Sequence, residues 1–250
     1  MTETPAFALP LPLFYRAPEP VSAVRQADWR LRSGDYRFAA DTAYVPVVIG
    51  EFVAIARHYP ILFAAGEAPA PVALLGVEQA NLFVTEGAWA EQVHIPAYVR
   101  RYPFGYVSTG ENDHFALALD TASDRIVRSG DEGQPLFRGG EPSDLTRQAL
   151  AFCEAFRLDA EATREFCEAL VRTELLVERR ADVTLPDGAK FGIQGFMVVD
   201  GERFAKLDAA TVVDWQHRGW LALVHHHLAS LDHFQVLLAR KLARAEKLAA

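Results

Sequence analysis

Hydrophobic positions in the first half of the chain occur in short runs that turn residues separate. These runs lie at residues 44–49, 60–64, 72–77, 80–84, 104–107 and 114–120. Apolar runs of this length, bounded by Gly, Pro, Asn and Asp, are typical of β-strands. Residues 50–59 instead carry apolar side chains at helical spacing, and Pro60 ends that pattern because proline cannot continue a helix. A second short helix is expected at 96–101, before Pro103.

Longer helical patterns follow in the second half. Ser143 is placed to cap a helix over 144–157. Asp159 is placed to cap another helix over 160–177. The PDG turn at 186–188 joins two apolar stretches, which predicts a β-hairpin. Near the C-terminus, one stripe of a helical wheel about 80° wide holds Trp220, Val224, His227, Leu231, Phe234, Leu238 and Leu242.

Together these patterns predict an α+β fold. We expect a mixed, mostly antiparallel sheet with short helices, followed by a helical and hairpin half that ends in a long amphipathic helix. Residues 1–34 are expected to form a Pro-rich N-terminal arm, and 35–130 the sheet region. The Gly-rich stretch 129–143 is the best candidate boundary, so 144–250 would be a second region unless the chain forms one continuous domain.

Composition narrows the class of protein. The 250 residues are 50% hydrophobic and 23% charged, with a formal net charge of −8, which is typical of a globular protein and argues against nucleic-acid binding. Cys153 and Cys167 lack the spacing of a metal site and are expected to be buried thiols. The sequence shows neither a signal-peptide pattern nor an apolar run long enough to span a membrane, so we expect a cytoplasmic protein. Peripheral association with the cell envelope is a further possibility.

One short motif occurs twice. ARHYPILF at 56–63 aligns with VRRYPFGY at 99–106, which pairs Arg57 with Arg100, His58 with Arg101, and Tyr59 with Tyr102. In both copies a short helix ends in cationic side chains, and a tyrosine before proline switches the chain to a strand. We interpret the motif chiefly as a fold device.

An anion site is the alternative for this motif. Arg100 or Arg101 would hold a carboxylate or phosphate, with Arg57 as a helper. Neighbouring residues on a helix point about 100° apart, so at most one of Arg100 and Arg101 would face a given pocket. Tyr102 would border that pocket.

Other residues are candidates for ligand binding. Glu51 and His58 lie seven residues apart near one helix face and could form an acid/base or ion pair, although separate interactions with the helix dipole explain them as well. Asn81, Trp89 and Tyr98 could line a pocket for a polar ligand, or serve as a structural amide and core aromatics.

Metal and catalytic motifs are weaker. The three histidines at 225–227 point in different directions on a helix, and His226 with His233 lacks a third ligand, so no metal site is predicted. His227 falls in the apolar stripe and is expected to be a hydrogen-bonded core histidine. No nucleophile elbow or nucleotide-binding loop is present. The basic end of the last helix could touch an acidic partner or a membrane surface, but a solvated helix end is the preferred interpretation.

Several blocks nevertheless resemble a known family. They are VPVVIGEF (45–52), RHYPILF (57–63), ALLGVEQANLFV (73–84), GAWAEQVHIPAYVRRYPF (87–104), GQPLF (133–137) and LVHHHLASLDHF (223–234). The combination is similar to the SapC family of bacterial proteins over about residues 35–240. The resemblance implies an association with a bacterial surface layer, and with genes for TonB-dependent receptors and halogenase-like flavoproteins. It implies no catalytic residues.

We therefore expect a non-enzymatic accessory or adaptor protein that binds a protein or a small anionic ligand in a bacterial cell-envelope or TonB-dependent uptake system. Homo-oligomers are compatible with this expectation, and no cofactor is predicted. One alternative is an enzyme acting on a small metabolite or peptide, with Glu51, His58, Asn81 and Arg100 in its site. A second is a component of surface-layer secretion or structure.

Overall fold

A computed structural model describes residues 11–66, 68–108, 115–184 and 190–249. The chain divides into two compact units that interleave along the sequence. Unit 1 comprises residues 1–35 and 101–155, and unit 2 comprises residues 36–100 and 156–250. None of the helices in the described ranges is long and apolar enough to cross a membrane.

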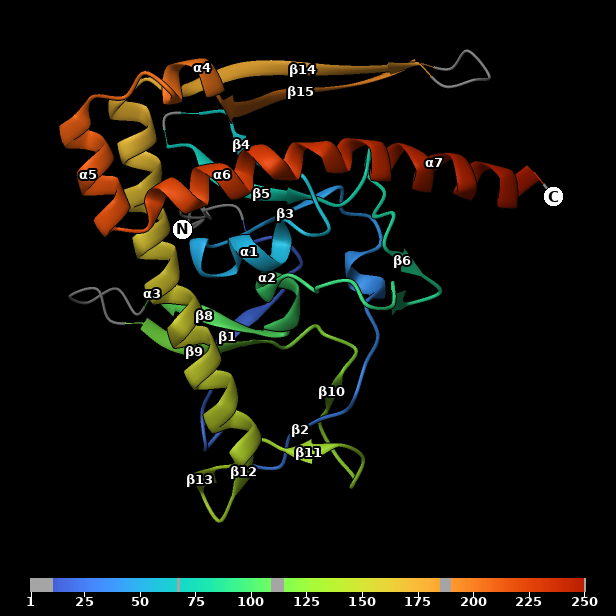
Figure 1. Cartoon of the computed structure of the whole chain (residues 1–250). Helices are drawn as coiled ribbons and strands as arrows, with labels where there is room; N and C mark the ends of the chain where they lie inside the picture. Colours follow the sequence, from blue (N-terminus) through green and yellow to red (C-terminus); the bar gives the residue numbers. More distant parts are fainter. Residues whose placement is uncertain (1–10, 67, 109–114, 185–189, 250) are drawn as a thin grey trace, which may run out of the picture. The chain divides into compact units, whose positions relative to one another are not determined.

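Unit 1 is built on a three-stranded antiparallel sheet in the order β1-β9-β8 (Figure 1). Its strands are β1 (Pro18–Pro20), β9 (Phe115–Asp120) and β8 (Phe104–Ser108). Smaller pairings involve β2 (Arg30–Leu31), β10 (Ile126–Val127), β11 (Gln134–Pro135), β12 (Phe137–Arg138) and β13 (Glu141–Pro142). The core of this unit is formed by Leu31, Phe104, Leu117, Leu119, Leu136, Phe137 and Cys153. Cys153 comes from α3 (Asp144–Arg172), which begins in this unit.

A carboxylate organises the N-terminal strand of unit 1. Asp120 is fully buried, and its Oδ1 accepts hydrogen bonds from the backbone N–H of Ala17 at 2.7 Å and of Arg16 at 3.3 Å. Its Oδ2 accepts a hydrogen bond from the Tyr102 hydroxyl at 2.9 Å. Burying this carboxylate costs little because both of its oxygens accept hydrogen bonds. Through these bonds Asp120, at the end of β9, holds the segment that leads into β1.

Unit 2 is built on a five-stranded antiparallel sheet in the order β14-β15-β4-β5-β3. The bounds are β14 (Leu176–Thr184), β15 (Lys190–Val199), β4 (Ile61–Ala64), β5 (Ala70–Leu74) and β3 (Tyr44–Pro46). A separate two-stranded hairpin joins β6 (Val84–Thr85) to β7 (Ala88–Trp89). Phe63, Ile61 and Leu62 are almost fully buried, as expected of a central strand with both faces covered.

Short helices surround the sheet of unit 2. They are η1 (Arg37–Ala39), η2 (Ile49–Glu51), α1 (Phe52–Ile55), α2 (Ala97–Arg100), α4 (Gly201–Phe204) and α5 (Ala209–His217). The C-terminal helical stretch consists of α6 (Trp220–Ser230), η3 (Leu231–His233) and α7 (Phe234–Ala249). In Figure 1 this stretch, in red, runs between the β14–β15 hairpin and the strands β3 and β5.

His227 on α6 bridges the strands β4 and β15 at the point where their backbone pairing ends. Pairing of β15 with β4 is limited to Phe196 with Ala64 and Met197 with Phe63. Two residues further along, the His227 ring lies between the strands: Nδ1 is 2.9 Å from the Ile61 carbonyl oxygen, and Nε2 accepts the Val199 N–H at 3.0 Å. Ser230 Oγ accepts the Ile61 N–H at 2.9 Å. Both polar groups of the Ile61 backbone are thus satisfied by side chains of α6.

The predicted α+β class and the long C-terminal helix are confirmed, whereas two details of the helical prediction are wrong. One continuous helix, α3, replaces the two expected over 144–157 and 160–177, because neither Gly nor Pro interrupts this stretch. In the C-terminal stretch Leu237 is buried in place of Leu238. The 3₁₀ turn at Leu231–His233 advances the helix by about 60° relative to an α-helix, which brings Leu237 to the core.

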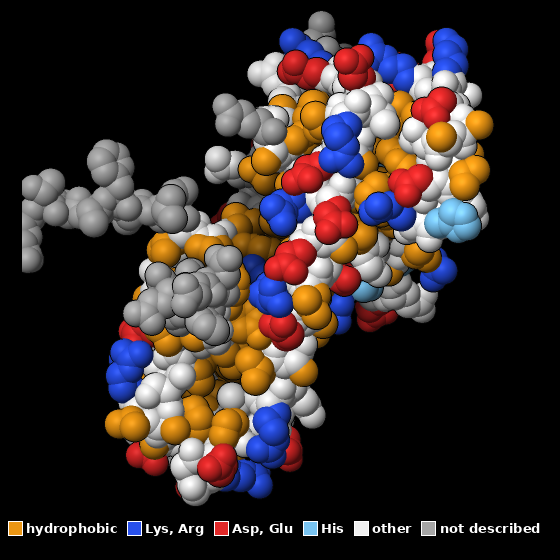
Figure 2. Space-filling model, turned by 90° about the vertical axis from the view of Figure 1, so that its left-hand side faces the viewer, with side chains coloured by type: hydrophobic (Ala, Val, Ile, Leu, Met, Phe, Trp, Pro, Cys, Tyr) orange, Lys and Arg blue, Asp and Glu red, His pale blue; other side chains and the backbone are white. Residues whose placement is uncertain are grey.

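Charged side chains cover the exposed surface in a mixed arrangement. Arg157 pairs with Glu161, and Arg172 with Glu168, at one-turn spacing along α3. Figure 2 shows one face of the molecule on which Lys and Arg alternate with Asp and Glu. On the described part of that face, cations do not form a large patch.

Candidate ligand-binding site

Four side chains of unit 2, three of them buried and His94 partly exposed, form a hydrogen-bond network. The Tyr59 hydroxyl donates to the backbone oxygen of His94 at 2.6 Å and accepts the Trp89 Nε1–H at 3.0 Å. Glu51 Oε2 accepts the Ala97 N–H at 2.8 Å and lies 3.2 Å from His94 Nε2. The network therefore joins the two segments that flank α1 to the strand β7 and the start of α2. Burial raises the pKa of Tyr59, which keeps its hydroxyl neutral as a donor.

Titratable groups close to this network influence one another. Burial lowers the pKa of His58, with smaller effects from His94, His233 and Arg57. Burial raises the pKa of Asp159, and the negative charge of Glu51 adds to this effect. Each shift favours the neutral form, which is the usual result of desolvation beside like charge. Within the described residues, three or more His, Cys, Asp or Glu side chains do not come together in a way that would hold a metal ion.

The structure brings some of the predicted site residues together and places others elsewhere. Glu51 and Trp89 belong to the network through Tyr59 and His94. Asn81 is fully buried, and its side-chain amide is hydrogen-bonded to backbone groups. Nδ2 donates to the Ala39 oxygen at 3.1 Å, and Oδ1 accepts a hydrogen bond from the Phe83 N–H at 2.8 Å. This amide shapes the loop before β6.

The two aromatic candidates outside the network lie in the core. Tyr98 is 5% exposed and makes an edge contact with Phe156 at 6.1 Å between ring centroids. Tyr102 is 4% exposed and donates to Asp120, as described for unit 1. Both aromatic side chains thus contribute to cores rather than to an exposed surface.

The arginines of the repeated motif fall in different places. Arg57 is exposed at the end of the α1 turn. Arg100 is also exposed, and its Nε donates back to the Ile95 oxygen at 2.9 Å. Arg101 belongs to unit 1, where its guanidinium lies 5.8 Å from the centroid of the Tyr15 ring. Since Arg100 and Arg101 belong to different units, they do not define a common site within either one.

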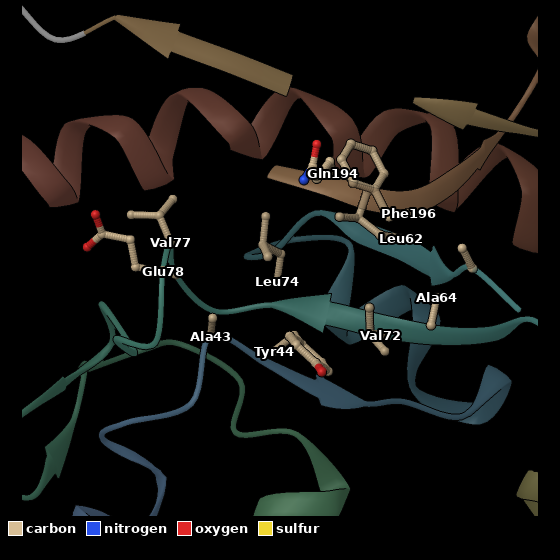
Figure 3. Close-up of a pocket in the computed structure, with 13 residues that line it drawn as sticks. Ala43, Tyr44, Leu62, Ala64, Val72, Leu74, Val77, Glu78, Gln194 and Phe196 are labelled. Atoms are coloured by element: carbon tan, nitrogen blue, oxygen red, sulfur yellow. The ribbon is translucent and has the colours of Figure 1, made fainter. Parts of the chain in front are cut away.

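A groove of about 470 Å³ lies on one face of the unit 2 sheet (Figure 3). Tyr44, Leu62, Val72, Leu74 and Phe196 form its apolar surface, and Figure 3 shows them rising from β3, β4, β5 and β15. Glu78 and Gln194 add polar groups. The Glu78 carboxylate is already paired with Lys241 Nζ on α7 at 3.1 Å.

A second cavity of about 570 Å³ lies between α7 and the β6–β7 hairpin, and we call it the arginine cavity. It is lined by Arg37, Ala40, Leu82, Val84, Thr85, Glu86, Gly87, Arg240, Ala243 and Arg244. Arg240 and Arg244 come from successive turns of α7, so their side chains share a face of that helix. Arg37 reaches the cavity from η1, where its Nη2 donates to the Glu86 backbone oxygen at 3.4 Å.

The two arginines of α7 are held without being neutralised. The Arg240 guanidinium lies over the Phe83 ring, 4.3 Å from its centroid, and Arg244 Nη1 donates to the Asn81 backbone oxygen at 3.0 Å. Within the described residues neither forms an ion pair, whereas Lys241 on the same helix pairs with Glu78. An aromatic face and a carbonyl fix the position of a cation but leave its charge in place.

Sequence reasoning missed Tyr59 and His94 as members of the network, and it treated the basic end of the last helix as solvated. The spacing of Arg240 and Arg244 by four residues was the one available signal for the arginine cavity, since it places both on one helix face. The residues that complete this cavity lie more than 150 positions earlier in the chain.

The chain was compared with models of protein families. The model described as SapC matches residues 21–237, which is most of the chain. No curated protein and no solved structure matches the chain.

Proposed function

The chain belongs to the SapC family, and from this premise we propose that it is a non-enzymatic accessory protein that binds a small anionic ligand in a bacterial cell-envelope or TonB-dependent uptake system. The family supplies the cellular setting of the proposal. The arginine cavity is the observation that carries the binding function.

Electrostatics favours an anion in this cavity. Arg240 and Arg244 carry like charges one helical turn apart, an arrangement that costs stability unless an anion compensates it. The protein has 33 acidic and 25 basic Lys and Arg residues, so acidic partners are plentiful. Even so, within the described residues neither Arg240 nor Arg244 forms an ion pair, whereas their neighbour Lys241 pairs with Glu78.

Binding is better supported than catalysis by the contacts of the predicted catalytic set. An enzyme would need Asn81 and Arg100 to face the same reactant as Glu51 and His58. The Asn81 amide is committed to Ala39 and Phe83, and Arg100 Nε is committed to Ile95. Glu51 likewise holds the backbone of α2. These groups maintain the fold, so we place function at the arginine cavity.

Isothermal titration calorimetry on the full chain tests this proposal, with hexyl phosphate as the probe at low ionic strength. We expect a dissociation constant of roughly millimolar or tighter, as is normal for a ligand of this size. The double variant R240Q/R244Q should bind at least about tenfold more weakly, because each charged hydrogen bond contributes strongly.

The matched control is K241Q, which removes one positive charge from the same helix but outside the cavity. It should change the affinity by about twofold at most, because the charge of Lys241 is already paired with Glu78 and Lys241 does not line the cavity. Thermal melts show whether each variant is folded. Equal losses in K241Q and in folded R240Q/R244Q, or the absence of binding to the wild type, would refute the proposal. Recovery of envelope or uptake proteins with the chain from native cells tests its cellular part.

A further inference from the structure

We infer that the ligand of the arginine cavity is amphipathic: an organic anion whose carboxylate or phosphate binds Arg240 and Arg244 while an aliphatic or aromatic body covers the apolar floor between α7 and β6. This inference rests on the proposed function and specifies the ligand class for the same site.

The floor of the cavity is apolar: Leu82 and Val84 are largely buried, whereas Ala243 is exposed. Leu82 is 7% exposed and Val84 is 3% exposed, although both line the cavity. Ala40 and Ala243 extend this surface from two further segments. A simple inorganic anion would satisfy the arginines without contacting this apolar surface, whereas an attached hydrocarbon would itself be removed from water by packing against it.

The arginines are positioned to receive the head group at the side of this floor. Arg240 presents one face to Phe83, and the N–H groups at the edge of a stacked guanidinium remain free to donate in its plane. Arg244 uses Nη1 for the Asn81 oxygen, and its other donors are left for a ligand. Each guanidinium group can donate two parallel hydrogen bonds to two oxygens of a planar carboxylate or a tetrahedral phosphate.

Size and access are consistent with a small organic molecule. A cavity of about 570 Å³ lies within the range that small-ligand sites occupy. Thr85, Glu86 and Arg244 at its rim are exposed, so a ligand can enter from solvent. Glu86 also lines the cavity, and its negative charge disfavours a second anionic group on the ligand. The body of the ligand is therefore expected to be uncharged.

A homologous series measures the contribution of the body. Calorimetry would compare inorganic phosphate with ethyl, butyl and hexyl phosphate, all below their micelle concentrations. Each fully buried methylene should strengthen binding about fourfold, and each half-buried one about twofold. From ethyl to hexyl phosphate we expect an affinity gain of roughly 16-fold to 250-fold.

Two glutamine variants locate the body. Ala243→Gln fills the floor and should abolish most of the gain with chain length while leaving ethyl phosphate bound. Ala245→Gln, exposed on the same helix and outside the cavity, should leave the whole series unchanged.

The outcomes separate the two proposals. If inorganic and hexyl phosphate bind equally well through Arg240 and Arg244, the amphipathic inference is wrong and anion binding stands. If A243Q and A245Q affect the series alike, the body does not lie on this floor and the inference also fails. If none of the four probes binds the wild type, both proposals fall.

Discussion

Replacing His227 with phenylalanine should destabilise unit 2 by breaking the bridge between β4 and β15. Phenylalanine has a similar shape but can neither donate to the Ile61 oxygen nor accept the Val199 N–H. Both backbone groups would stay buried without partners, at about 1–3 kcal/mol each. We therefore expect the free energy of unfolding to fall by roughly 2–6 kcal/mol, a large share of the roughly 5–15 kcal/mol that a domain possesses.

The same histidine predicts a dependence on pH. Burial lowers the pKa of His227 to about 4, from an ordinary value of 6.5. The folded protein therefore keeps the ring neutral while the unfolded chain takes up a proton below pH 6.5, so stability is lost as the pH falls from about 6.5 to 4. The shift corresponds to roughly 3 kcal/mol at the acid end of this range. The phenylalanine variant lacks this loss.

Urea unfolding of the full chain at pH 7, 5.5 and 4 measures both effects, and His226→Phe on the same helix is the control. The stability gap between wild type and H227F should narrow by roughly 3 kcal/mol between pH 7 and pH 4. A gap that stays constant over this range, or an H226F variant as unstable as H227F at pH 7, would show that the bridging role assigned to His227 is wrong.

Three further predictions concern other buried groups. Tyr59→Phe should lower the free energy of unfolding by about 1–3 kcal/mol and alter Trp89 fluorescence, because the hydroxyl that bonds Trp89 and His94 is lost; an unchanged spectrum and stability would contradict the network. Asp120→Ala should speed amide hydrogen exchange at Ala17, measured by mass spectrometry, since that amide loses its acceptor; unchanged protection would argue against this role. Burial raises the pKa of Cys153 to about 11 and that of Cys167 to about 12. Both thiols should therefore resist iodoacetamide at pH 8 until urea unfolds the chain. Rapid labelling of the native protein would contradict their burial.

Local patterns predicted the elements that depend on local chemistry. The apolar runs at 60–64 and 114–120 became β4 and β9, because strands buried in a sheet must be apolar at successive positions. The prediction that a second helix starts at Asp159 was wrong, because α3 continues through this residue. A residue that can cap a helix marks a helix start only where the neighbouring sequence also permits a break.

The candidate site was less predictable because its contacts are distant in sequence. Glu51 was singled out with His58, seven residues away, yet its hydrogen-bond partner is His94, which only the fold brings near. The arginine cavity joins residues 82–87 to 240–244. Helical periodicity could place Arg240 and Arg244 on one face, but it contains no information on which segment that face would meet.

The interleaving of the two units has a consequence for synthesis on the ribosome. The core of unit 1 needs both Leu31 and Cys153, so it cannot close until the first part of α3 has emerged. By then β4 has long been outside the ribosome, but the helix that supplies His227 and Ser230 to Ile61 is still to be translated. A nascent chain that has reached residue 200 therefore carries β4 with the backbone N–H and C=O of Ile61 still without their partners. This is the stage at which a chaperone that recognises open strand edges would have its longest opportunity to bind.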